Sequence, residues 1–208
     1  MRVLVFGDSI AQGFYDRAGG WVNRLREYYD TVAIGSGDQS QPTVFNLGVS
    51  GNTTKDLLRR LENETLARAY PGEAVAFVIA IGTNDSLYRN NDNDSEPEDF
   101  QEELNKTLDI VRKYSDKILF VGLFPVVDGL LQPIPWSSTG KCYSTVRMKL
   151  FNRVLESFCQ EHKLPFVDLW SVLSISLTLK RYFTMGFTPI QKGTNSLPKP
   201  SNQNSRSV

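Results

Sequence analysis

Ser9 is the first residue of the chain whose type and position suit a nucleophile. It stands in the sequence Gly-Asp-Ser-Ile at residues 7–10, directly after the apolar run Val3–Phe6. If Ser9 begins a helical segment, its own backbone N–H faces a ligand and can stabilise a developing oxyanion. A phosphate-binding turn or a simple helix cap uses the same residue types. The Gly-Asp-Ser sequence alone therefore leaves the chemistry open.

Two later segments could supply hydrogen-bond donors to the same oxyanion. The first contains Gly48, whose N–H we expect to face a ligand, and Gly51, which permits a tight turn. The second contains Asn84, whose side-chain amide is a candidate donor, and Asp85, which we expect to hold its loop by accepting backbone N–H groups. An ordinary strand–helix connection would explain the first segment equally well, and an Asx turn would explain the second. With Ser9, the three segments provide one nucleophile and two donors, the arrangement for acyl transfer.

Short apolar runs precede all three segments and predict the strands of a parallel sheet, because they are apolar on both faces. The runs are Val3–Phe6, Thr43–Leu47, Ala74–Ile81, Ile118–Leu123 and Pro165–Leu169. Helical spacing of apolar residues predicts helices between them, at Trp21–Tyr29, Thr54–Leu66, Phe100–Tyr114 and Val146–Glu161. Thr53, three residues before Asp56, is a candidate N-cap for the second helix. Alternating strands and helices predict an α/β fold that gathers the three segments at one sheet edge.

Two loops, Ser86–Glu98 and Phe124–Tyr143, follow the carboxyl ends of the third and fourth predicted strands. Open α/β sheets bind ligands at these ends, so we expect the loops to wall the pocket. The candidates for lining an acyl site are Leu130, Leu131, Ile134 and Trp136. Ordinary surface packing would explain these side chains equally well.

Composition limits the kind of partner and compartment. A chain of 208 residues with 40% apolar residues fits one domain. Its 23 basic and 23 acidic residues argue against a nucleic-acid partner. Mean hydropathy of −0.28 and the lack of a long apolar run argue against a membrane span. The two cysteines, Cys142 and Cys159, are expected to be free thiols, and the short first apolar run favours the cytoplasm. The oligomeric state is left open.

Gly-Asp-Ser-Ile at 7–10, Asn-Leu-Gly-Val-Ser-Gly at 46–51 and Gly-Thr-Asn-Asp at 82–85 resemble, in order and spacing, the first three sequence blocks of the GDSL/SGNH hydrolase family. The resemblance covers roughly residues 1–172. It implies a flavodoxin-like three-layer α/β/α sandwich with a five-stranded parallel sheet.

The resemblance also implies roles for individual residues. Ser9 matches the catalytic nucleophile. The family's oxyanion hole corresponds in this chain to the N–H groups of Ser9 and Gly48 and the side-chain amide of Asn84. Asp8 and Asp85 are expected to support these groups. The reaction implied is hydrolysis of small acyl esters or thioesters through an acyl-serine intermediate, without a metal or a cofactor.

The chain departs from the family at the fourth block, a late Asp-x-x-His that supplies the general base and its orienting carboxylate. The only histidine, His162, precedes the last predicted strand, so we expect it as a solvated helix-end residue across the domain from Ser9. Asp168 comes too early for the block, and we interpret it as structural. Serine without a base is a poor nucleophile. We therefore predict an impaired hydrolase. The alternative is a non-catalytic α/β binding protein that keeps the pocket.

The missing block is compatible with the nucleotides that can encode Thr184–Ser196. Read one nucleotide earlier, these codons permit Asp-Gly-Phe-His-Pro-Asn-Thr-Lys-Gly-His-Gln-Leu, which resembles the family's fourth block. We hypothesise a frameshift near residues 170–176. Residues 1–172 would then form the hydrolase-like domain, and residues 173–208 an aberrant, disordered or poorly packed tail. The nucleotide sequence tests this hypothesis.

Overall fold

The main sheet is parallel and has five strands in the order β2-β1-β3-β6-β8. The strands are β1 (Arg2–Gly7), β2 (Thr43–Gly48), β3 (Val75–Ala80), β6 (Ile118–Val121) and β8 (Phe166–Val167). The computed structural model describes residues 1–174 except 15, 39, 90, 91, 127 and 136, and also residues 183–184 and 188–189, which pair as β9 (Phe183–Thr184) and β10 (Thr188–Pro189). The five predicted strands and their parallel pairing are confirmed, although β8 is shorter than expected.

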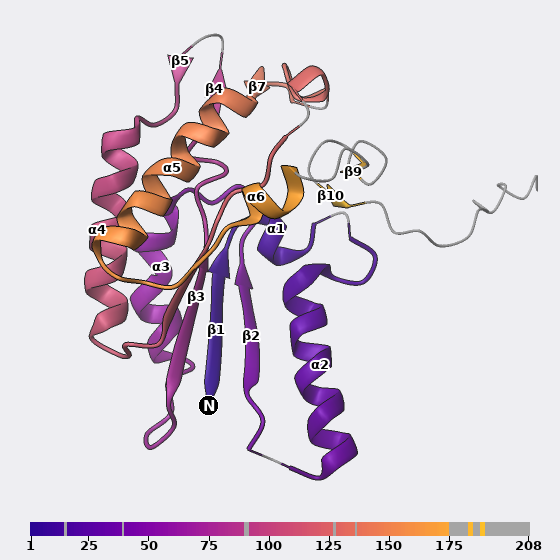
Figure 1. Ribbon diagram of the computed structural model, residues 1–208, viewed down its shortest axis with the longest axis vertical. Coiled ribbons are helices and arrows are strands. Elements are labelled where there is room, and N and C mark those ends of the chain that lie inside the picture. The colour runs from indigo at the N-terminus through magenta and orange to yellow at the C-terminus, as the bar shows by residue number, and fades with distance from the viewer. Residues whose placement is uncertain are drawn as a thin grey trace, which may run out of the picture.

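Helices cover the two faces of this sheet (Figure 1). The helices α3 (Thr54–Leu66), α4 (Pro97–Arg112) and α5 (Thr145–Glu161) lie on one face, and α1 (Ser9–Gln12) and α2 (Gly20–Ser36) lie on the other. Successive strand residues point to opposite faces. Leu4 and Phe6 of β1 therefore join the larger core under α3, α4 and α5, while Val3 and Val5 join the smaller core with Val22 of α2.

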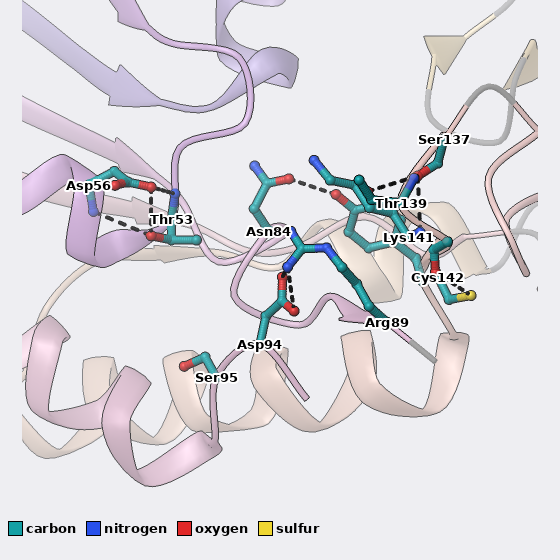
Figure 2. Close-up of polar contacts among 12 residues, drawn as sticks. Thr53, Asp56, Asn84, Arg89, Asp94, Ser95, Ser137, Thr139, Lys141 and Cys142 are labelled. Atoms are coloured by element: carbon teal, nitrogen blue, oxygen red, sulfur yellow. Dashed lines mark hydrogen bonds and ion pairs between the residues drawn. The ribbon is translucent and has the colours of Figure 1, made fainter. Parts of the chain in front are cut away.

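A capping box starts α3 where the sequence predicts it. The Thr53 side chain accepts a hydrogen bond from the Asp56 N–H, and the Asp56 carboxylate accepts from the Thr53 N–H (Figure 2). Together they satisfy two of the backbone donors that a helix leaves open at its start. This cap fixes where the chain leaves the segment after β2 and enters α3.

A second, small sheet joins the two long loops, and sequence patterns did not predict it. It pairs β4 (Tyr88–Arg89) antiparallel with both β5 (Asp92–Asn93) and β7 (Lys141–Cys142). Arg147 of α5 holds the first loop from below, since its guanidinium donates to the carbonyls of Ser86 and Ser95. The second loop also contains the 3-10 helix Asp128–Leu130, and α6 (Leu169–Ser174) follows β8. These links bring residues far apart in sequence to the same end of the main sheet.

Several expectations concern the chain as a whole. Cys142 and Cys159 are both free thiols. Among the residues that the structure describes, no helix has the length and apolar character needed to cross a bilayer. Most of the predicted aberrant tail, residues 173–208, lies outside the described residues, so the proposed division of the chain stays a prediction.

Candidate active site

Ser9 is the first residue of α1, at the carboxyl end of β1. The N-cap of this helix is Asp8, whose Oδ1 accepts a hydrogen bond of 2.9 Å from the Ile10 N–H. Asp8 is only 1% exposed. Burial raises the pKa of Asp8 to about 6, although hydrogen bonds from Ile10 and the Thr83 side chain act in the opposite direction. The buried cap thus fixes the turn that presents Ser9.

Ser9 lies in the wall of a cavity of about 590 Å³. Ser9, Gly51 and Asn84 all line this cavity. Most of the remaining wall is apolar and comes from the sheet face and from α2. It includes Trp21, Leu25, Val78, Leu119, Val121 and Val167. A cavity with a few polar groups at an apolar wall is the usual form of a small-molecule site.

The segment after β2 reaches the cavity through a turn. The Asn52 N–H donates to the Val49 carbonyl at 3.1 Å, and the Ser50 N–H donates to Oε1 of Gln12 in α1 at 2.8 Å. Within this turn Gly51 has φ of +82°, a conformation that favours glycine. The turn places Gly51 beside Ser9 in the cavity wall.

Gly48 is placed differently from the expectation that its N–H faces a ligand. The Gly48 N–H donates to Oδ1 of Asn46 at 3.0 Å, and Gly48 is not among the residues that line the cavity. A Cβ at Gly48 would lie 2.2 Å from the backbone nitrogen of Gln12, so the glycine allows α1 to approach β2 closely. This close approach gives Gly48 a packing role between α1 and β2, and its oxyanion role stays a prediction.

Asn84 is held at both ends of its side-chain amide. Its Nδ2 donates to the Asn52 carbonyl at 2.9 Å. Its Oδ1 accepts a hydrogen bond of 2.6 Å from the Tyr143 hydroxyl, and this bond is the dashed line at Asn84 in Figure 2. Asn84 and Tyr143 both line the cavity. The amide is therefore fixed in one orientation beside Ser9.

Asp85 is fully buried behind the cavity. Its carboxylate accepts hydrogen bonds from the Thr54 N–H at 2.9 and 3.2 Å and so supports the first turn of α3. Burial raises the pKa of Asp85 to about 7, although the hydrogen bonds from Thr54 oppose this shift. Acceptance of a backbone N–H agrees with the expectation from sequence, but the N–H belongs to α3 rather than to the loop of Asp85.

The four candidates for an acyl site separate in the structure. Ile134 lines the cavity, whereas Leu131 is buried in the larger core and Leu130 is 47% exposed. Trp136 lies outside the described residues. Ile134 alone of these four is shown at the cavity wall.

His162 and Asp168, which were not expected to act as a base, make other contacts in the structure. His162 is the C-cap of α5, its Nε2 is 3.2 Å from Oδ1 of Asn105, and its ring packs against Phe158. The helix α5 ends at Glu161, on the side of the molecule away from α1 (Figure 1), and His162 caps this end before the chain enters β8. Asp168 follows β8, and its Oδ1 accepts from the Ser171 N–H at 3.0 Å. Hydrogen bonds from the side chain and then the N–H of Ser171 hold the pKa of Asp168 below its usual value.

Two residues near the site were missed in the sequence. Tyr143 stands in a proline-rich loop without periodicity, so no pattern marks it. Arg60 lies on α3 and donates from Nε to Oδ1 of Asn52 at 2.8 Å and from a terminal nitrogen to the Gly7 carbonyl at 3.2 Å. Burial lowers the pKa of Arg60. An arginine within the apolar stripe of a predicted helix was the available signal for it.

Comparisons with known proteins show the family and the fold of the chain. The sequence profile of the GDSL-like Lipase/Acylhydrolase family matches residues 5–189. No curated protein matches the chain by sequence. Among solved structures, a lipase/acylhydrolase from Enterococcus faecalis superposes with a TM-score of 0.68 at 24% identity, covering 91% of this chain and 87% of that one.

Two further structures share the fold. A GDSL-like lipase from Bacteroides thetaiotaomicron has a TM-score of 0.62 at 19% identity, with 90% of this chain and 79% of that chain covered. A member of the lipolytic protein G-D-S-L family from Veillonella parvula has a TM-score of 0.63 at 16% identity, with 91% and 88% covered. The three-layer α/β sandwich with its parallel sheet is thus the fold of these hydrolases. Because the family profile matches most of the length of the chain, the chain belongs to the GDSL-like lipase/acylhydrolase family of esterase- and lipase-type hydrolases.

Proposed function

We propose that the protein hydrolyses esters through an acyl-serine intermediate on Ser9. The Ser9 Oγ attacks the carbonyl carbon of the ester, the alcohol leaves, and water then releases the acyl group. The observation that carries the proposal is that Ser9, Gly51 and Asn84 border one cavity. It unites a nucleophile with donors for the oxyanion of a tetrahedral intermediate.

The oxyanion donors in this proposal are the N–H groups of Ser9 and Gly51 and Nδ2 of Asn84. Gly51 takes the place first predicted for Gly48, because it borders the cavity and its N–H makes no hydrogen bond to another described residue. Ser9 is the first residue of α1, so its N–H has no partner within the helix. Each such donor contributes roughly 10²–10³ in kcat in serine hydrolases.

The cavity supports small acyl esters or thioesters as substrates. The wall contributed by Val78, Leu119 and Val121 is apolar and continues from Ser9 over the sheet. Burying the methylene groups of an acyl chain against such a wall is favourable by about 0.8 kcal/mol per group.

A cytoplasmic location stays a prediction, which cell fractionation would test.

We further propose that this chain is an impaired form of the enzyme. Among the described residues no imidazole lies beside Ser9, since His162 contacts Asn105 and Phe158 at the other end of α5. A serine hydrolase that lacks a member of its triad retains only about 10³–10⁴-fold catalysis over water. The hypothesised frameshift near residues 170–176 accounts for the missing Asp-x-x-His block.

The test is ester hydrolysis by this chain and by a version whose C-terminal reading frame is restored. We expect the restored version to hydrolyse p-nitrophenyl acetate at least about 10³-fold faster than this chain. Ser9→Ala should remove that gain. A restored version that is no faster, or that keeps its rate with Ser9→Ala, contradicts the proposal.

A non-catalytic binding protein is the second candidate function, favoured because no imidazole lies beside Ser9 in the part of the chain that the structure describes. This candidate predicts that neither version hydrolyses the ester while an ester analogue still binds the cavity. Isothermal titration of both versions with a non-hydrolysable ether analogue distinguishes the two functions.

A further inference from the structure

The side-chain amide of Asn84 can serve an oxyanion only in one orientation. An asparagine amide has two N–H donors on Nδ2 and one acceptor on Oδ1, and rotation by half a turn exchanges them. In the required orientation Nδ2 faces the site. The contacts of the amide therefore decide whether Asn84 acts as a donor.

One contact excludes the exchanged orientation. Nδ2 of Asn84 donates to the Asn52 carbonyl at 2.9 Å. The exchange would bring Oδ1 against that carbonyl, where neither oxygen has a proton to share. Asn52 is itself held in place, because its own Oδ1 accepts from Nε of Arg60 at 2.8 Å. One N–H of Nδ2 is used by this contact, and the second, which makes no hydrogen bond to another described residue, can serve a ligand.

The other contact locks the amide from the opposite side. The Tyr143 hydroxyl donates to Oδ1 of Asn84 at 2.6 Å, a short distance for this type of hydrogen bond. Tyr143 is 6% exposed, and burial raises the pKa of its hydroxyl, so the group stays protonated and can act as the donor. Donation to Oδ1 also polarises the amide and strengthens its N–H groups as donors.

The small sheet explains how residues so distant in sequence meet. Asn84 lies shortly before β4, Tyr143 directly follows β7, and β4 pairs with β7 in the register Tyr88 to Cys142. The Tyr143 N–H further donates to the Leu131 carbonyl at 3.0 Å. Tyr143 is thus held by backbone pairing on both sides of its loop, and its ring is a rigid support for Asn84.

From these contacts we infer that Tyr143 is a positioning residue for the Asn84 oxyanion donor, an inference that rests on the proposed ester hydrolysis. Tyr143 acts through Asn84 and makes no bond to the reacting atoms. Loss of its hydroxyl leaves Oδ1 of Asn84 without this partner, so the amide is held only by its contact with Asn52, and the second N–H of Nδ2 can tilt out of line with the oxyanion. The ring of phenylalanine fills the same space, so the fold is retained.

The deciding measurement is the nuclear magnetic resonance signal of the Asn84 side-chain amide in the unligated chain, which needs no enzyme activity. In Tyr143→Phe we expect the Nδ2 protons to exchange with water at least about tenfold faster and their signals to move. Tyr114→Phe is the matched control, since its hydroxyl donates to Glu62 at 3.2 Å, away from the site. If the Asn84 amide signals in Tyr143→Phe keep the positions and the exchange rates that they have in the wild type, the inference is overturned.

The second test is kinetic and uses the Ser9-dependent hydrolysis of p-nitrophenyl acetate. Tyr143→Phe should lower kcat about tenfold with KM nearly unchanged, because only the transition state bears the oxyanion. In the Asn84→Ala background the same substitution should change kcat less than about twofold. An undiminished tenfold effect in that background overturns the inference.

The two tests separate the inference from the function on which it rests. Hydrolysis that is the same in wild type and Ser9→Ala ends the proposed function, and the Asn84 signals then still decide whether Tyr143 orients the amide. Ser9-dependent hydrolysis together with Asn84 signals that ignore Tyr143→Phe leaves the proposed function in place and ends the inference.

Discussion

Replacement of Asp85 by asparagine tests the electrostatics behind the site. Asp85 is fully buried, and burial raises its pKa from 3.8 to about 7. A carboxyl whose folded-state pKa is raised stabilises the fold most when it is protonated. Its contribution is therefore fully present below pH ~4 and is lost as the pH rises through about 7.

The size of this effect follows from the two pKa values. Between pH 5 and pH 7 the unfolded carboxyl is ionised, while the folded one still holds its proton. Each pH unit in this interval lowers the free energy of unfolding by ~1.4 kcal/mol, and the loss levels off above the folded-state pKa. From pH 5 to pH 8 the wild type should thus lose roughly 2.5 kcal/mol through this group.

The assay is urea unfolding of wild type and Asp85→Asn at pH 5 and pH 8. Asparagine keeps an oxygen acceptor for the Thr54 N–H but does not titrate. The stability of Asp85→Asn relative to wild type should rise by roughly 2.5 kcal/mol between the two pH values. Asp109→Asn, at an exposed position of α4, is the control and should show no such change. If the free energy of unfolding of Asp85→Asn differs from that of the wild type by the same amount at both pH values, the reasoning is refuted.

Three substitutions test the local structure by chemical denaturation. Thr53→Ala removes the capping box of α3 and should lower the free energy of unfolding by about 1 kcal/mol, whereas no loss would mean that the cap is unimportant. Gly48→Ala places a Cβ 2.2 Å from the Gln12 nitrogen and should destabilise by about 2–3 kcal/mol. A Cβ at Gly51 would have no neighbour within 4 Å, so only the φ of +82° opposes Gly51→Ala. The loss in the free energy of unfolding should therefore be smaller, about 1 kcal/mol. Equal losses at the two glycines contradict the packing role of Gly48.

The sequence predicted the elements that depend on local pattern. The five strands were visible because each is apolar on both faces, and the start of α3 was visible because Thr53 and Asp56 form a capping box with fixed spacing. Ser9 and Asn84 were correctly expected at the carboxyl ends of neighbouring strands, since parallel topology alone brings these ends together.

The parts that were missed depend on contacts between distant segments. Pairing of β4 with β7 involves strands of two residues, which no periodicity can mark. Gly48 and Gly51 stand three residues apart, and only the turn between them decides which of the two lines the cavity. Tyr143 meets Asn84 solely because the small sheet joins their loops.

The most direct test of the central claim, that Ser9 is the acyl acceptor, is the mass of the protein after a short exposure to p-nitrophenyl acetate. Among the described residues no imidazole lies beside Ser9, and this slows both the attack of Ser9 and the later attack of water. Because p-nitrophenolate leaves without needing a proton, acylation of Ser9 depends less on a base than release of the acyl group does, so the acyl-serine should accumulate. We predict one acetyl group on the peptide that contains Ser9, and none on that peptide in Ser9→Ala or in the urea-unfolded chain. An unmodified Ser9, or acetyl groups on lysines alone, contradicts the account.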